Sequence, residues 1–172
     1  VYGRYRKLER DIPQTKWPCR DCNGTGRQRD EICPGCDGSG YRYDESVEQL
    51  TAPAVEEAMD GDGVTFHGAG REDVDALILG GGRPFVIEVD EPRVRDVDPV
   101  ELQAEVNAFA DGKAEVEGLR LATHEMVERV KEHDASKTYR MDVALEGTVD
   151  EATFEDALAE LDGATIHQDT PQ

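Results

Sequence analysis

The chain of 172 residues is long enough for one ordinary domain and a small module, and it carries a net charge of −20. No apolar run reaches the roughly 20 residues that a membrane-spanning helix needs, and no signal peptide is visible. We therefore expect a cytoplasmic protein without a membrane partner. The acidic charge also opposes simple coulombic attraction to nucleic acid.

The acidic excess lies almost entirely in the later part of the chain. Residues 1–46 hold nine basic and eight acidic groups, and residues 47–172 hold ten and 31, which gives +1 and −21. Only five of the basic residues are lysines. Abundant carboxylates with few lysines predict a halophilic protein, hydrated by its acidic surface. In 1 M salt the Debye length is about 3 Å, so shape and hydrogen bonds must carry much of any recognition of RNA.

Three parts follow one another along the chain. Residues 1–17 are expected to form an extended lead-in, because Pro13 and Pro18 discourage a helix. Residues 18–43 form a glycine-rich cysteine module, and residues 44–172 form an α+β domain. Basic residues alternate with aromatic ones in the lead-in. This pattern suits a nucleic-acid backbone with stacked bases, although an ordinary linker explains it equally well.

The order of strands and helices in the domain predicts its architecture. Apolar periodicity and capping residues indicate helices near 46–59 (broken at Pro53), 98–110, 124–132 and 148–162, and strands at 64–67, 84–89, 114–121, 139–145 and 164–167. From Pro84 onward the main order is strand, helix, strand, strand, helix, strand. This order predicts a ferredoxin-like (RRM-like) antiparallel sheet with helices on one face. The open face of such a sheet often binds RNA.

The four cysteines stand in two copies of the pattern CxxCxGxG, at residues 19–26 and 33–40. Two thiolates on one tight turn, repeated once, supply the four soft ligands that Zn²⁺ takes in a structural site. Two disulfides and four free thiols are the alternatives, and an intracellular chain disfavours disulfides. The module also resembles the cysteine-rich region of DnaJ-type chaperones, which normally has more copies. The sequence predicts one structural Zn²⁺ bound by Cys19, Cys22, Cys33 and Cys36.

A charged string, Arg71-Glu72-Asp73, follows the predicted strand at 64–67. Most such loops are simply solvated. Gly68 and Gly70 nevertheless leave room for a substrate backbone to approach closely, which makes this loop a candidate catalytic site.

Several long motifs are similar to one known family, the archaeal and eukaryotic tRNA T-loop pseudouridine synthases, the tenth Pus family. The matching strings are GRY (3–5), IPQTKWPC (12–19), FHGAGREDVD (66–75), GRPFVIEV (82–89), SKTYR (136–140) and, in part, Gln168, Thr170 and Pro171. The resemblance runs over nearly the whole chain, with the motifs in order and correctly spaced. It implies that the chain is a fragment of a haloarchaeal member, incomplete as a catalytic domain.

The resemblance implies isomerisation of uridine to pseudouridine in the T loop of tRNA without an organic cofactor. Carried onto this sequence, Asp73 is the nucleophile and Arg71 its neighbour in an Arg-x-Asp pattern. Tyr139 stacks on the target base, although its spacing alone fits a core residue of a strand. Gly70 and Arg83 are the remaining expected substrate contacts, and the T arm of tRNA is the expected partner.

Two other functions remain open. The chain could be a zinc-stabilised RNA-binding fragment without catalysis, because the family completes its active site with residues from later motifs. It could also be a DnaJ-like peptide-binding module fused to another domain, but residues 18–43 contain few apolar side chains to line a peptide groove. The sequence predicts no oligomeric state.

Overall fold

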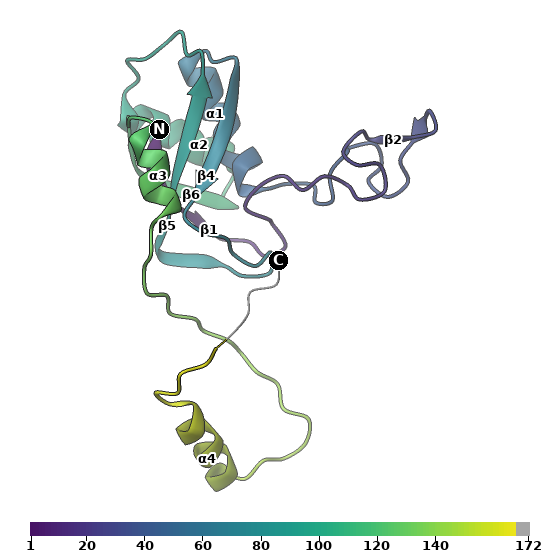
Figure 1. Cartoon of the computed structure of the whole chain (residues 1–172), viewed down its shortest axis with the longest axis vertical. Helices are drawn as coiled ribbons and strands as arrows, with labels where there is room; N and C mark the ends of the chain where they lie inside the picture. The colour runs from purple at the N-terminus through teal and green to yellow at the C-terminus, as the bar shows by residue number, and fades with distance from the viewer. Residues whose placement is uncertain (168–172) are drawn as a thin grey trace. The chain divides into compact units, whose positions relative to one another are not determined.

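The computed structural model describes residues 1–167, and their contacts divide the chain into two units (Figure 1). The first unit is Val1–Asp134 and the second begins at Ala135. The partly matched motif at Gln168, Thr170 and Pro171 lies outside the described residues. Among the described helices, none combines the length and the apolar character that crossing a membrane requires.

The first unit contains one main sheet and a small hairpin. Its elements in chain order are β1 (Tyr2–Lys7), β2 (Arg27–Gln28), β3 (Glu31–Ile32), α1 (Val47–Met59), β4 (Gly63–Gly68), β5 (Ile78–Asp90), α2 (Pro99–Phe109), β6 (Ala114–Arg120) and α3 (Glu125–Lys131). The main sheet has the strand order β4-β5-β1-β6, and all three neighbouring pairs are antiparallel. Apart from the β2–β3 hairpin, β1 to β6 run in the order βαββαβ, which confirms the ferredoxin-like class.

The structure confirms the predicted helices and the predicted strands near 64–67, 84–89 and 114–121, but another segment supplies the fourth strand of the sheet. Residues 2–7, expected in the lead-in, form the inner strand β1 between β5 and β6. Residues 139–145 and 164–167, expected as strands, have no regular secondary structure. The cysteine module is therefore an insertion between the first strand and the first helix of the domain. The four strands of the sheet all come from residues 2–120.

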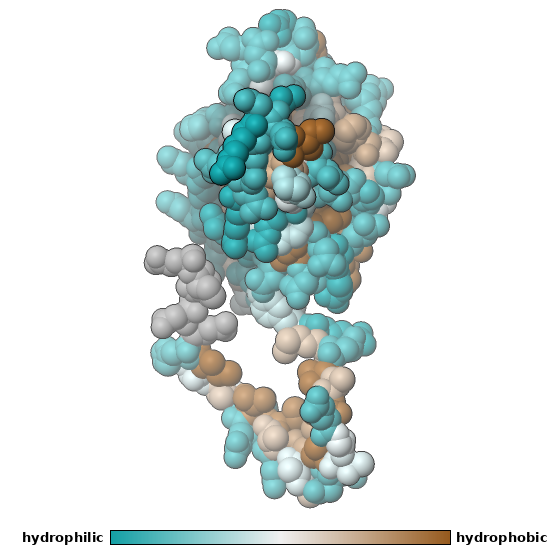
Figure 2. Space-filling view, turned by 90° about the vertical axis from the view of Figure 1, so that its right-hand side faces the viewer, coloured by the Kyte–Doolittle hydropathy of each residue, from teal (hydrophilic) through white to brown (hydrophobic). Residues whose placement is uncertain are grey.

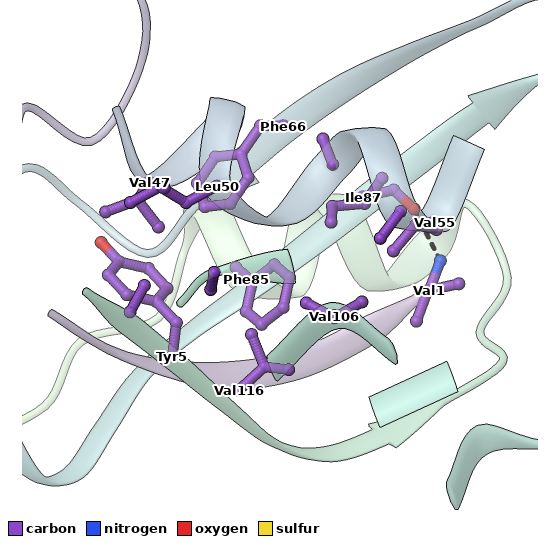
Figure 3. Close-up of a cluster of buried hydrophobic side chains, with 14 of the residues drawn as sticks. Val1, Tyr5, Val47, Leu50, Val55, Phe66, Phe85, Ile87, Val106 and Val116 are labelled. Carbon is purple, nitrogen blue, oxygen red and sulfur yellow. Dashed lines mark hydrogen bonds between the residues drawn. The ribbon is translucent and has the colours of Figure 1, made fainter. Parts of the chain in front are cut away.

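The core lies between the sheet and the helices α1 and α2. Tyr5, Phe85, Ile87 and Val116 point from the strands into this layer and are almost completely buried (Figure 3). The rings of Phe66 and Phe85 are stacked with centroids 5.4 Å apart, and Tyr5 meets both rings edge-on. Burial of aromatic rings in these arrangements accounts for much of the packing at this end of the sheet.

Helices in both units begin at residues that cap them, and two details differ from the prediction, one in each unit. Ser46 caps α1 by accepting from the Gln49 amide at 3.1 Å, and Asp98 caps α2 by accepting from the Val100 amide at 2.7 Å. The break expected at Pro53 is wrong, because α1 is continuous through this exposed proline. In the second unit Asp150 rather than Thr148 caps the helix.

The other face of the sheet is partly covered by α3, which the open-face prediction did not anticipate. Val127 and Val130 of this helix are buried against Val86 and Ala69, with Met126 and Tyr2 at the edge. Arg4 and Arg6 also lie on this face, since they alternate with the core-facing residues of β1.

The second unit has one helix among its described residues, α4 (Glu151–Leu161), and none of the helical residues is buried. Apolar side chains are exposed along this unit (Figure 2).

Candidate active-site loop and cysteine cluster

The segment between β4 and β5 carries the predicted catalytic residues. Arg71 and Asp73 are exposed, whereas the Glu72 side chain between them is only 1% exposed. Glu72 therefore points into the protein, and its two neighbours point toward solvent. This alternation presents the Arg-x-Asp pair at the surface of the loop.

Two hydrogen-bond donors and one cation surround the buried Glu72 carboxylate. The Tyr5 hydroxyl donates to Oε2 at 2.6 Å, and the Gln14 amide donates to the same oxygen at 3.2 Å. The Arg83 Nε lies 2.8 Å from that oxygen as an ion pair, although its N–H is not aligned for a hydrogen bond. Arg83 also donates from Nη1 to the Ala69 carbonyl at 2.7 Å.

Lys7 fixes the same loop from the core side. Lys7 is fully buried. Its Nζ donates to the carbonyls of Ile12, Asp73 and Val74 at 2.8, 3.2 and 3.0 Å. Burial lowers the pKa of the Lys7 ammonium, and the nearby Glu72 carboxylate acts in the opposite direction. A buried cation with three carbonyl acceptors satisfies the rule that buried charges need hydrogen-bonding partners.

The backbone of Asp73 is consequently held while its carboxylate is not. Besides Lys7, the Ala76 amide donates to the Asp73 carbonyl at 3.1 Å. Within residues 1–167, neither the Asp73 carboxylate nor the Arg71 guanidinium makes a hydrogen bond or an ion pair, so the two are not paired with each other. The arrangement offers an exposed carboxylate on a fixed backbone, which is what an attacking or proton-accepting group requires.

The structure places the other predicted substrate contacts differently. Gly70 is exposed with φ of 69°, a conformation that favours glycine. Arg83 is directed to Glu72 and Ala69 instead of to solvent. Tyr139 is 76% exposed and belongs to the second unit, so it is described apart from the Asp73 loop.

Sequence reasoning missed the residues that support the loop, namely Tyr5, Lys7, Gln14 and Glu72. One signal was available, because Gly3, Tyr5 and Lys7 alternate with Tyr2, Arg4 and Arg6 at the period of a strand. A lysine in a core-facing position hides this pattern from a search for apolar residues.

The four cysteines form the second candidate site. One sulfur from each lies within 4.8 Å of all the others, with 4.0 Å between Cys19 and Cys33 and 3.7 Å between Cys22 and Cys36. These separations exclude disulfides, in which the sulfurs are about 2.05 Å apart. The cluster is a set of thiols that could hold a metal ion.

The two CxxCxGxG turns support the cluster in the same way. The Gly26 amide donates to the Cys22 sulfur at 3.2 Å, and the Gly40 amide donates to the Cys36 sulfur at 3.3 Å. Burial tends to raise the Cys22 pKa, but the Gly26 hydrogen bond and the neighbouring thiols lower this pKa to about 7. Amides directed at the sulfurs favour the thiolate form that binds metals.

An aromatic group lies where the module joins the domain. The ring of Trp17 is 40% exposed and meets the ring of Tyr43 edge-on at 5.6 Å. The guanidinium of Arg42 lies 5.6 Å from the Trp17 centroid and 5.3 Å from that of Tyr43. A cation held against exposed rings offers a surface on which bases can stack.

Together these features define a class: a ferredoxin-like α+β domain with an inserted four-cysteine module and an exposed Arg-x-Asp loop. The family model described as Pus10, C-terminal, matches residues 1–172. The chain belongs to this family.

Curated relatives agree over almost the whole chain. It is 67% identical over 99% of its length to a tRNA pseudouridine synthase Pus10 of Halorubrum lacusprofundi, and covers 40% of that protein. The corresponding protein of Methanothrix thermoacetophila is 46% identical over 99% of the chain, which covers 36% of it. The corresponding protein of Methanocaldococcus jannaschii is 41% identical over 100% of the chain, which covers 36% of it. The chain thus spans about two-fifths of these relatives.

Proposed function

We propose that the full-length protein containing this chain is a tRNA pseudouridine synthase that isomerises uridine in the T loop. The observation that carries the proposal is the exposed Asp73 carboxylate on a loop fixed by buried Lys7 and Glu72. The printed names of the relatives support the reaction and the tRNA substrate. The T arm as the site of modification follows from the motif resemblance.

The reaction needs a group of this kind. The bond between the ribose C1′ and N1 of uracil breaks, the base rotates, a C1′–C5 bond forms, the C5 proton leaves and N1 takes up a proton, so that the product is an isomer of uridine. Asp73 assists the detachment by attacking or deprotonating the ribose, and is regenerated because a carboxylate is a good leaving group. Arg71 is its neighbour in the Arg-x-Asp pattern and is exposed on the same loop. Tyr139 holds the extruded base by stacking.

Zn²⁺ is the metal that fits the cysteine cluster. Sulfurs bound tetrahedrally at about 2.3 Å from zinc lie about 3.8 Å apart, close to the 4.0 Å between Cys19 and Cys33 and the 3.7 Å between Cys22 and Cys36. Four thiolates leave no open coordination position, so the ion would stabilise the module and take no part in the reaction.

The proposal also covers the salt concentration and the compartment in which the enzyme works. The net charge of −20 with only five lysines supports a halophilic enzyme, and we place it in the cytoplasm as part of the proposal. At high salt, stacking on Trp17 and hydrogen bonds to RNA lose less of their strength than charge attraction does.

The alternative of an inactive RNA-binding fragment applies to the chain taken alone. Asp73 has no cationic partner within residues 1–167, and a carboxylate nucleophile gains from one. We expect the isolated chain to show weak tRNA binding and no measurable isomerisation.

The proposal is tested by Asp73→Asn in the full-length protein. Pseudouridine formation in unmodified tRNA should stop, while tRNA binding changes by less than about threefold, because an amide cannot act as the nucleophile. Asp75→Asn is the matched control, since Asp75 is also an exposed loop aspartate, and it should retain turnover. Normal turnover by the Asp73 variant would refute the assignment.

A further inference from the structure

We infer that Glu72 is a positioning residue, whose buried carboxylate fixes the loop backbone so that Asp73 is presented to the substrate. The inference rests on the proposed function, because it assigns a role around the same nucleophile. It reverses the expectation that a charged residue within a solvated loop matters little.

The contacts of Glu72 connect the loop to three separate parts of the domain. Tyr5 comes from β1, Gln14 from the segment that leads to the cysteine module, and Arg83 from β5. Gln14 also donates to the Tyr5 hydroxyl at 2.9 Å and to the Gly70 carbonyl at 3.2 Å. One carboxylate thus joins the loop to both strands beneath it.

Two glycines make room for this network. A Cβ at Gly68 would lie 2.5 Å from the Gln14 side-chain nitrogen, and a Cβ at Gly82 would lie 2.6 Å from the Tyr5 carbonyl oxygen. Gly82 also has φ of 64°. The close approach of strand, loop and donors therefore depends on residues without side chains.

Because Glu72 points into the protein, its neighbour Asp73 points toward solvent. Successive side chains of a nearly extended segment point to opposite sides, and residues 71–73 show this alternation, with Glu72 inward and its two neighbours outward. Releasing Glu72 would free the segment to rotate. A displacement of about 1 Å of a catalytic group can cost a hundredfold in rate.

A purely stabilising role explains the network less well. Replacing a buried ion pair by apolar residues is often neutral or stabilising, so such a pair is weak evidence for stability. The hydrogen bonds from Tyr5 and Gln14 to Oε2 do, however, specify one position for this carboxylate. Its position next to Asp73 puts that geometry where catalysis needs it.

Tyr5 allows one hydrogen bond of the network to be removed without disturbing the core, because its ring packs in the core and only its hydroxyl contacts Glu72. The ring packs edge-on against Phe66 and Phe85 at 5.9 and 5.8 Å, while the hydroxyl enters the Glu72 network. Tyr5→Phe keeps the packing and removes only the hydrogen bond. Burial, followed by the Glu72 charge, raises the Tyr5 pKa well above 10, so the hydroxyl remains a donor.

The experiment compares Glu72→Gln, Tyr5→Phe and the control Val116→Ala in the full-length protein. Val116 is a core residue of β6 that lies opposite Tyr5 in the strand register, and it makes none of the hydrogen bonds of the Glu72 network. Turnover of tRNA, the KM for tRNA, thermal stability and amide hydrogen exchange of residues 69–76 are measured for each variant.

We expect kcat to fall about a hundredfold in Glu72→Gln and about tenfold in Tyr5→Phe, with KM changed less than threefold and faster exchange at 69–76. Val116→Ala should lose thermal stability without losing kcat below its melting temperature. The inference is overturned if both network variants lose stability alone, as the control does. If Glu72→Gln does not fold, Tyr5→Phe decides.

The exchange measurement separates this inference from the proposed function. If Asp73→Asn stays active but Glu72→Gln loosens residues 69–76, the proposed nucleophile is wrong and Glu72 still fixes the loop. If exchange at 69–76 does not change in either network variant, Glu72 does not position the loop, whatever the activity.

Discussion

The first unit and the described part of the second differ in structure, and the strength of their sequence patterns does not predict the difference. Residues 2–7 have a weak apolar pattern and become an inner strand of the sheet. Residues 139–145 have a strong alternating pattern, yet its four apolar side chains remain exposed and no strand forms. The exposures of Tyr139, Met141, Val143 and Leu145 are 76, 79, 73 and 56%.

The difference shows that a strand depends on its pairing partners as much as on its own residues. β1 pairs on both sides, with β5 and β6, so its backbone groups have hydrogen-bonding partners in two neighbouring strands. A strand without a partner leaves its backbone groups to water and gains no cross-strand contacts. Alternation predicts which face a strand will bury only once such a partner is present.

The largest expected effect would show whether the order of the first unit depends on a metal. Cys33→Ser, or removal of the ion by a chelator, should unfold the module between Pro18 and Tyr41, because metal binding supplies about 10 kcal/mol or more in small zinc modules. The main sheet should persist, since the cysteines form a cluster separate from the apolar core.

Elemental analysis and amide exchange together check this prediction. The wild-type chain should contain about one zinc, the expectation for four thiolate ligands, and Glu31→Gln, an exposed change in the same module, should keep it. Loss of the sheet on chelation would show that metal rather than apolar burial orders the whole first unit.

The sequence predicted the local features better than the long-range ones. The helix start at Asp98 and the cysteine cluster depend on residues close together in the chain, and both were predicted. The burial of Glu72 depends on Tyr5 and Gln14, which are 67 and 58 residues away. No local pattern reports such a partner, so the burial of Glu72 was not predicted.

A pair of phenylalanines gives the most direct comparison of the two units. Phe85 is 1% exposed in β5, and Phe154 is 47% exposed in α4. Phe85→Ala should lower the free energy of unfolding by about 3–5 kcal/mol, because it leaves a cavity in the core. Phe154→Ala should change it by less than about 0.5 kcal/mol.

Denaturant titration followed by circular dichroism measures both values in the same chain at high salt. Wild type and variants should share one slope if the native state stays the same. Equal losses for the two substitutions would mean that Phe154 is buried in solution, and the contrast between the units would fail.

The smallest expected effect concerns the attachment of α3 to the sheet. Glu88 of β5 lies 3.0 Å from Nε2 of His67 on β4 and 2.8 Å from Nδ1 of His124 at the start of α3. The hydrogen bond with His67, and then that with His124, holds the pKa of the Glu88 carboxyl below its usual value of 4.5.

A carboxyl with a lower pKa in the folded state stabilises the protein above about pH 4.5, and this contribution disappears as the pH falls through the folded-state pKa. Glu88→Gln should therefore lower the melting temperature slightly at pH 6, by a difference that shrinks toward pH 3. Solvent screens this partly exposed group, so the shift should be small. Any loss of metal in acid affects both proteins and cancels in the difference between them. A constant difference from pH 6 to pH 3 would show that the ionised Glu88 does not fasten α3, and that the apolar contacts of Val127 and Val130 alone hold this helix on the sheet.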